Sequence, residues 1–279
     1  MGLVTAVGCG GEMVVGENRA ALPERPRQVA GVWDGSSAAA AWRAGYHPTG
    51  EAVELPRGGL HGGADQRAYK EGNFRVRGAL PGTGPKHGEV TWAAGESVTR
   101  PLVGAKEAYG GLAVPRGDRD GESQLTVTGV ELGRMRLATS RGPASVPAWV
   151  FTLDGYASPL KRAAAVPSKT PRSPVGPAHD LPGFPLDRLL KVSADGRSVT
   201  VVAMHGVCDD GPTVDVLETR DSVVLTASVT GRDRDRVCTA QGKLERVEVP
   251  LRKPLGDRVL LDAHSGRPVP YRGTNGLAP

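Results

Sequence analysis

Aromatic residues are scarce in this chain, which limits how its core can be built. Phe, Trp and Tyr make up 4% of the 279 residues, so Val, Leu and Ala must supply most of the buried surface. The 39 glycines and 23 prolines favour long loops and short strands over helices. No run approaches the roughly eighteen apolar residues of a membrane-spanning helix.

The chain also lacks any long stretch in which charges of one sign predominate. The 35 basic and 30 acidic residues give a net charge of +5, and the two signs alternate, as in Arg232–Arg236. No basic stripe is interleaved with aromatic residues, and no nucleic-acid-binding motif is present. The composition therefore predicts no nucleic-acid partner.

Familiar catalytic and metal-binding motifs are absent. The sequence contains no Gly-x-Ser-x-Gly, no His-Glu-x-x-His and no EF-hand loop. It therefore indicates no cofactor and no metal, and it favours a non-enzymatic protein. A secreted hydrolase whose site is assembled from distant residues, such as His61, His205 and Asp209, stays open as the alternative, because catalytic triads are recognised in space.

The densest β-type pattern lies in the stretch Val199–Asp262. Four segments there alternate or run apolar over strand length: Val199–Met204, Thr213–Glu218, Val223–Val229 and Glu245–Leu251. Turn residues such as Asp, Gly and Pro separate them. The pattern predicts a small antiparallel sheet.

The first half of the chain shows weaker strand signals. The strand candidates are Asn73–Leu80, its suggested partner Glu89–Trp92, and the series Leu125–Val130, Arg134–Thr139 and Val146–Leu153. Gly133 is predicted to be a turn between two of them. Trp149 and Phe151 share one face of the last strand, so we expect that face to be core rather than a binding platform.

Two short helices are predicted. Ser36–Tyr46 is rich in alanine, with Ser36 or Ser37 as the N-cap and Gly45 at the end. Pro101–Val114 is the second, because proline is favoured at the first helical position.

These signals together predict a mainly β protein built from two small antiparallel sheet modules, sandwich- or barrel-like, with one or two short helices. The expected divisions are a truncated signal and tether (1–27), an N-terminal β-rich domain with short helices (28–156), a proline-rich connector (157–192), a C-terminal disulfide-stapled β domain (193–272) and a loose tail (273–279).

The first cysteine has the setting of a lipid attachment site. Ala6-Val7-Gly8-Cys9 has the small residues that precede the acylated cysteine of a bacterial lipobox. No Lys or Arg precedes Cys9, and the apolar stretch is about half the usual length, which a start codon assigned too far downstream would explain. An incidental cysteine near the terminus is the alternative.

If Cys9 carries lipid, two cysteines remain, Cys208 and Cys238, and an even number of cysteines outside the cytosol suggests a disulfide. We predict that they form a disulfide, a bond that persists outside the cytosol. In the loop-entropy model, closing this loop stabilises the folded protein by roughly 3.5–4 kcal/mol. Three alternatives are open: a metal site that includes His205, a nucleophilic Cys208 with His205 as base, and free thiols in a cytosolic protein.

Two loops carry residues that could line a ligand site. The glycine-rich loop Gly58–Asp65 contains His61 and Asp65, and the turn after the first C-terminal strand contains His205 and Asp209. A histidine or aspartate in such a loop is more often a solvated or turn-forming residue, so these four are candidates only.

The lipobox-like start, the segment Val146–Tyr156 (VPAWVFTLDGY) and the segment Val247–Asp262 (VEVPLRKPLGDRVLLD) together resemble uncharacterised lipoproteins of high-GC Gram-positive bacteria. The resemblance implies an extracytoplasmic location on the outer face of the plasma membrane, attached to the membrane surface through lipid on Cys9. It implies no catalytic residues. We therefore expect a binding or scaffolding component of the cell envelope.

Overall fold

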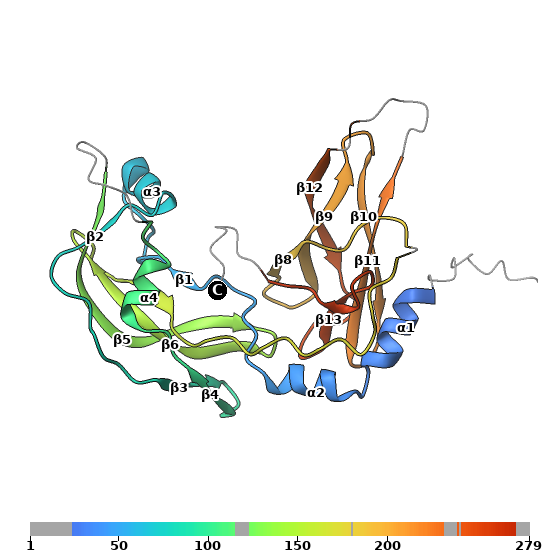
Figure 1. Ribbon diagram of the computed structural model, residues 1–279, viewed down its shortest axis with the longest axis horizontal. Helices are drawn as coiled ribbons and strands as arrows, with labels where there is room; N and C mark the ends of the chain where they lie inside the picture. Colours follow the sequence, from blue (N-terminus) through green and yellow to red (C-terminus); the bar gives the residue numbers. More distant parts are fainter. Residues whose placement is uncertain (1–23, 115–122, 180, 232–238, 240, 272–279) are drawn as a thin grey trace, which may run out of the picture.

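The computed structural model describes residues 24–114, 123–179, 181–231, 239 and 241–271. The protein is mainly β, as predicted, and its two β-rich modules lie side by side (Figure 1). The helices are α1 Glu24–Trp33, α2 Ser37–Ala44, α3 Gly62–Lys70 and α4 Ala105–Gly110. The strands are β1 Val53–Glu54, β2 Phe74–Val76, β3 His87–Trp92, β4 Ser97–Pro101, β5 Leu125–Thr139, β6 Gly142–Leu153, β7 Leu160–Ala163, β8 Arg188–Val192, β9 Ser198–Gly206, β10 Gly211–Glu218, β11 Ser222–Thr230, β12 Gly242–Pro250, β13 Val259–Asp262 and β14 Arg267–Pro268.

The C-terminal module is a sandwich of two sheets. One has the strand order β10-β11-β13-β14 and the other β12-β9-β8. The four segments predicted as strands are β9, β10, β11 and β12. Most pairs are antiparallel as expected, but β11 and β13 are parallel. Val201 of β9, Leu225 of β11 and Leu260 of β13 belong to one core cluster between the sheets, so aliphatic side chains build this interior almost alone.

Two N-terminal helices cover the outer face of the larger sheet (Figure 1). Trp33 is fully buried in this contact, and its indole nitrogen donates a hydrogen bond to the Gly266 carbonyl. Ser36 caps α2 by accepting from the Ala39 amide, as predicted. Expectation and structure differ in two respects: α1 begins inside the segment predicted to be a tether, and both helices pack against the C-terminal sheet rather than the N-terminal one.

The N-terminal module is a seven-stranded sheet centred on the long β5–β6 hairpin. The predicted turn at Gly133 is wrong, because β5 runs without interruption through this residue, which lies opposite Ala148 of β6. A β-carbon at Gly133 would lie 2.8 Å from a methyl group of Val150. The glycine therefore allows close packing within the ladder. Trp149 and Phe151 are core residues, as predicted.

Three other expectations for this half are wrong. β2 pairs in parallel with β5, whereas β3 pairs with β4 and β6. The predicted helix from residue 101 begins only at residue 105, because Pro101 belongs to β4 and the Leu102 and Val103 amides bond to Lys86 and Ala164. The connector also contributes a strand, β7, to the N-terminal sheet.

The last residues of the connector form β8 of the C-terminal module. Its described residues between β7 and β8 contain no helix or strand, and they bond to both modules. The Ser168 amide donates to the Tyr46 carbonyl, and the Ala178 amide donates to the His264 carbonyl. The tip of the β5–β6 hairpin and the turns of the C-terminal sandwich face each other across this junction.

Candidate binding site between the modules

A crevice with two lobes lies at the module junction. The smaller lobe has a volume of about 190 Å³ and the larger about 410 Å³. Thr49, Ser140 and Leu255 line both lobes, so the lobes adjoin. The N-terminal module contributes the hairpin tip, and the C-terminal module contributes the β8–β9 turn and the loop before β13.

An aromatic stack forms one wall of the smaller lobe. The rings of Trp42 and His47 lie 3.8 Å apart at an interplanar angle of 7°. His47 is 6% exposed. Burial, reinforced by the charge of Arg100, lowers the pKa of His47 from 6.5 to about 4, so the ring is neutral at pH 7. Its Nε2 packs against Gly45, where a β-carbon would lie 2.4 Å away.

Ser140 lines both lobes, and its side chain carries an unused hydroxyl. It occupies the turn of the β5–β6 hairpin, where its amide donates to the His47 carbonyl. The side chain is buried, and its Oγ has no hydrogen-bond partner. A buried hydroxyl without a partner is unfavourable, so a ligand that bonds to it would recover that free energy.

The larger lobe carries two carboxylates, Asp195 and Asp257. Asp195 accepts bonds from the Ser193 hydroxyl and the Arg197 amide. These bonds lower its pKa. Arg141 also lines the lobe, but its guanidinium pairs with Glu96.

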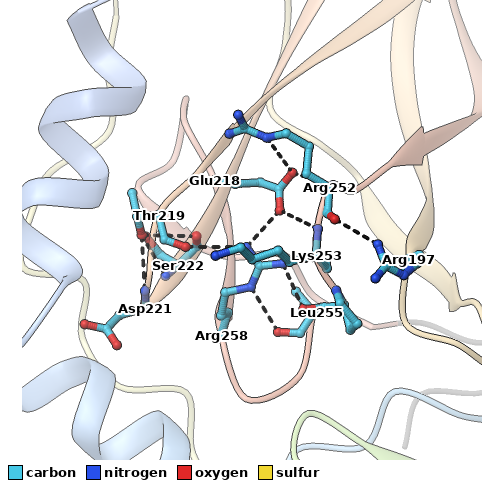
Figure 2. Close-up of polar contacts among 10 residues, drawn as sticks. Arg197, Glu218, Thr219, Asp221, Ser222, Arg252, Lys253, Leu255 and Arg258 are labelled. Atoms are coloured by element: carbon cyan, nitrogen blue, oxygen red, sulfur yellow. Dashed lines mark hydrogen bonds and ion pairs between the residues drawn. The ribbon is translucent and has the colours of Figure 1, made fainter.

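A buried ion pair holds the loop that forms the C-terminal wall (Figure 2). Arg258 donates to Glu218 at 2.9 Å and to the carbonyls of Lys253 and Pro254. Glu218 also accepts from the Arg252 and Lys253 amides. Burial tends to raise the pKa of Glu218, but these hydrogen bonds outweigh it and the net shift is downward. The network fixes the backbone on both sides of Leu255.

The predicted residues His61 and Asp65 do lie together, but they line neither lobe of the crevice. The rings of His61 and Tyr156 stack 4.1 Å apart. The Tyr156 hydroxyl accepts from the His61 amide and donates to Asp65 at 2.6 Å. His61 begins α3 and is exposed. The bonds join α3 to the end of the β6 strand, so they have a structural explanation.

His205 and Asp209 line a second cavity of about 440 Å³ in the C-terminal module. His205 is 5% exposed, its Nε2 lies 3.3 Å from Glu245, and its Nδ1 has no hydrogen-bond partner. Asp209 accepts from the Gly206 amide. His205 lies at the opposite end of β9 from the turn that borders the crevice, so this cavity is separate.

Cys208 lines this second cavity, whereas Cys9 and Cys238 lie outside the described residues. Within the described ranges, no three His, Cys, Asp or Glu side chains gather closely enough to hold a metal ion. No helix in the described part of the chain is long and apolar enough to cross a membrane.

The sequence reasoning missed the crevice residues. A local signal existed, because Trp42 and His47 lie five residues apart around the predicted helix end at Gly45. The other walls come from the hairpin tip, the connector and two C-terminal loops, whose meeting depends on module packing.

No protein-family model matches the chain, and neither the curated proteins nor the solved structures contain a significant match. The chain's own geometry is therefore the basis for assigning it a function.

Proposed function

We propose that this chain is a lipid-anchored extracytoplasmic binding protein, without catalytic activity, that holds a small ligand in the crevice between its two modules. The observation that carries the proposal is the buried, unpartnered Ser140 hydroxyl in a crevice between modules. Ligand sites are mostly apolar, concentrate at such junctions and have volumes of about 300–1,000 Å³, a range that includes the larger lobe.

The hydrolase alternative receives less support. Its suggested residues are divided, with His61 in the N-terminal module and His205 and Asp209 in the C-terminal one. Nucleophilic catalysis needs a base that bonds to a nucleophile on one side and to an orienting group on the other. His205 has Glu245 on one side, but its Nδ1 bonds to nothing in the described part of the chain.

Ligand-observed NMR with neutral, cationic, anionic and peptide fragments tests the binding site. In Thr49→Trp the indole fills the point where the lobes meet, so fragment binding should disappear. Thr128→Trp is the matched control, because Thr128 is an exposed residue near the far end of the same hairpin. The proposal fails if no fragment binds, or if Thr49→Trp binds as the wild type does.

The anchor depends on Cys9. Metabolic palmitate labelling of the full gene product should place the label on this protein in the membrane fraction. The label should disappear in Cys9→Ala. Labelling that survives the substitution would remove the anchor from the proposal and leave the crevice argument unchanged.

The proposed compartment also requires the Cys208–Cys238 disulfide. The β9–β12 ladder supports this pairing, because the Val207 amide donates to the Gln241 carbonyl at 3.2 Å, and these residues are one and three positions from the two cysteines. Intact mass after alkylation should show both thiols protected until the protein is reduced. Alkylation of both without reduction, in protein from its native compartment, would contradict the disulfide.

A further inference from the structure

Hydroxyl groups dominate the polar lining of the smaller lobe. They belong to Thr49, Ser140, Ser168, Thr170 and Tyr271. Burial raises the pKa of Tyr271 to about 12, so its phenol keeps its proton at neutral pH. A hydroxyl both donates and accepts a hydrogen bond. The lining therefore suits a ligand with several groups of the same kind.

The described lining of the smaller lobe offers no free charge. Among the described residues that line this lobe, Arg258 alone is ionised, and its guanidinium is already bonded to Glu218 and to backbone carbonyls. His47 is neutral because of its depressed pKa. A charged ligand would lose its hydration here without gaining a counter-ion.

The larger lobe disfavours anions for a related reason. In the part of the chain that the structure describes, the one cation in its lining is Arg141, which pairs with Glu96 and stacks 4.0 Å from the centre of the Trp92 ring. Asp195 and Asp257 supply carboxylate oxygens. Such oxygens accept hydrogen bonds from ligand hydroxyls.

Rings form part of the apolar lining of the smaller lobe, and aliphatic side chains (Leu189, Leu255, Leu260 and Val269) form the rest. Besides the Trp42–His47 stack, the smaller lobe has the prolines Pro48, Pro167 and Pro268 along its walls. The C–H face of a pyranose ring is apolar, whereas its edge carries hydroxyls, so a sugar can pack its face on such rings and bond through its edge.

We infer that the crevice ligand is an uncharged carbohydrate, with one sugar ring in the smaller lobe and its hydroxyl edge toward Ser140 and the larger lobe. This inference rests on the proposed function, because it names the ligand class of the same site. It goes beyond that proposal by excluding anionic ligands and by predicting that cationic ligands bind more weakly than neutral ones.

Saturation-transfer NMR with a small panel of sugars tests the class. The neutral probes are glucose, galactose, mannose, arabinose and N-acetylglucosamine, and the charged analogues are glucuronate and glucosamine. At least one neutral sugar should bind in the millimolar range expected for a ligand of this size. Glucuronate should bind more weakly than glucose.

Ser140→Ala should weaken the binding of that sugar about 3- to 10-fold, the loss expected for one hydrogen bond. The variant should keep or raise its thermal midpoint, because the buried Ser140 hydroxyl has no partner in the free protein and its removal breaks no hydrogen bond. Thr128→Ala is the control. Thr128 lies on the same hairpin, roughly 35–40 Å away along the strand, and the substitution should leave sugar binding unchanged.

Several results would overturn the inference. They are the absence of binding by every neutral sugar, binding of glucuronate equal to that of glucose, preference for glucosamine over the neutral sugars, and full sugar binding by Ser140→Ala. If non-sugar fragments still bind to the wild type and fail with Thr49→Trp, the ligand class is wrong and the binding proposal stands. If no probe of any kind binds, both fail.

Discussion

Between neutral pH and about pH 4, protonation linked to His47 should cost the protein roughly 3 kcal/mol of folding stability. His47 is 6% exposed and stacks on Trp42. Burial, reinforced by Arg100, lowers its pKa to about 4. In the unfolded chain the same ring titrates near its ordinary value of 6.5.

The direction of this pH dependence of stability follows from which state, folded or unfolded, takes up the proton. Between these two pKa values the unfolded chain binds a proton that the folded chain does not, so acid favours unfolding. The contribution of His47 is complete above the unfolded pKa and declines as the pH falls toward the folded one. Each pKa unit is worth about 1.36 kcal/mol, which gives roughly 2 kcal/mol lost at pH 5 and about 3 kcal/mol at pH 4.

The assay is urea unfolding followed by tryptophan fluorescence at a series of pH values. Other groups also titrate in this range, so the informative quantity is the difference between the wild type and His47→Gln. The variant should start less stable, because the stack on Trp42 is lost, but its stability should fall less steeply with acid. His87→Gln, at an exposed position of β3, should follow the wild type. Parallel pH dependence of His47→Gln and the wild type would refute the reasoning.

Gly45→Ala should destabilise the protein by about 1–3 kcal/mol, because its β-carbon would lie 2.4 Å from the His47 ring. Gly31→Ala, in α1 with nothing within 4 Å, should instead stabilise the protein by about 0.5–1 kcal/mol; thermal unfolding compares them, and similar midpoints would contradict the packing argument. Glu218→Gln should cost about 3–5 kcal/mol, because it leaves the Arg258 guanidinium buried without its carboxylate. Arg252→Gln, at a side chain 71% exposed, should change stability by less than about 1 kcal/mol; equal losses in urea titrations would disprove the role given to the buried pair.

Local patterns predicted the strands of the C-terminal module well, because alternation along a strand reports which side chains are buried. The same reasoning failed at Gly133. A glycine in a strand pattern marks either a turn or a close approach within a sheet, and only the position of Val150 on the neighbouring strand distinguishes the two. Similarly, the β2–β5 pairing joins segments about fifty residues apart, which no local pattern encodes.

The chain's sequence by itself determined the mainly β class, the aliphatic core, a serine cap for α2 at Ser36 or Ser37, and the burial of Trp149 and Phe151, since each depends on neighbouring residues along one element. Tertiary structure alone decided that α1 and α2 cover the C-terminal sheet and that Ser140 lines a crevice. The physical reason is that an apolar face specifies burial without specifying its partner, and the crevice walls come from segments that meet only when both modules are packed together.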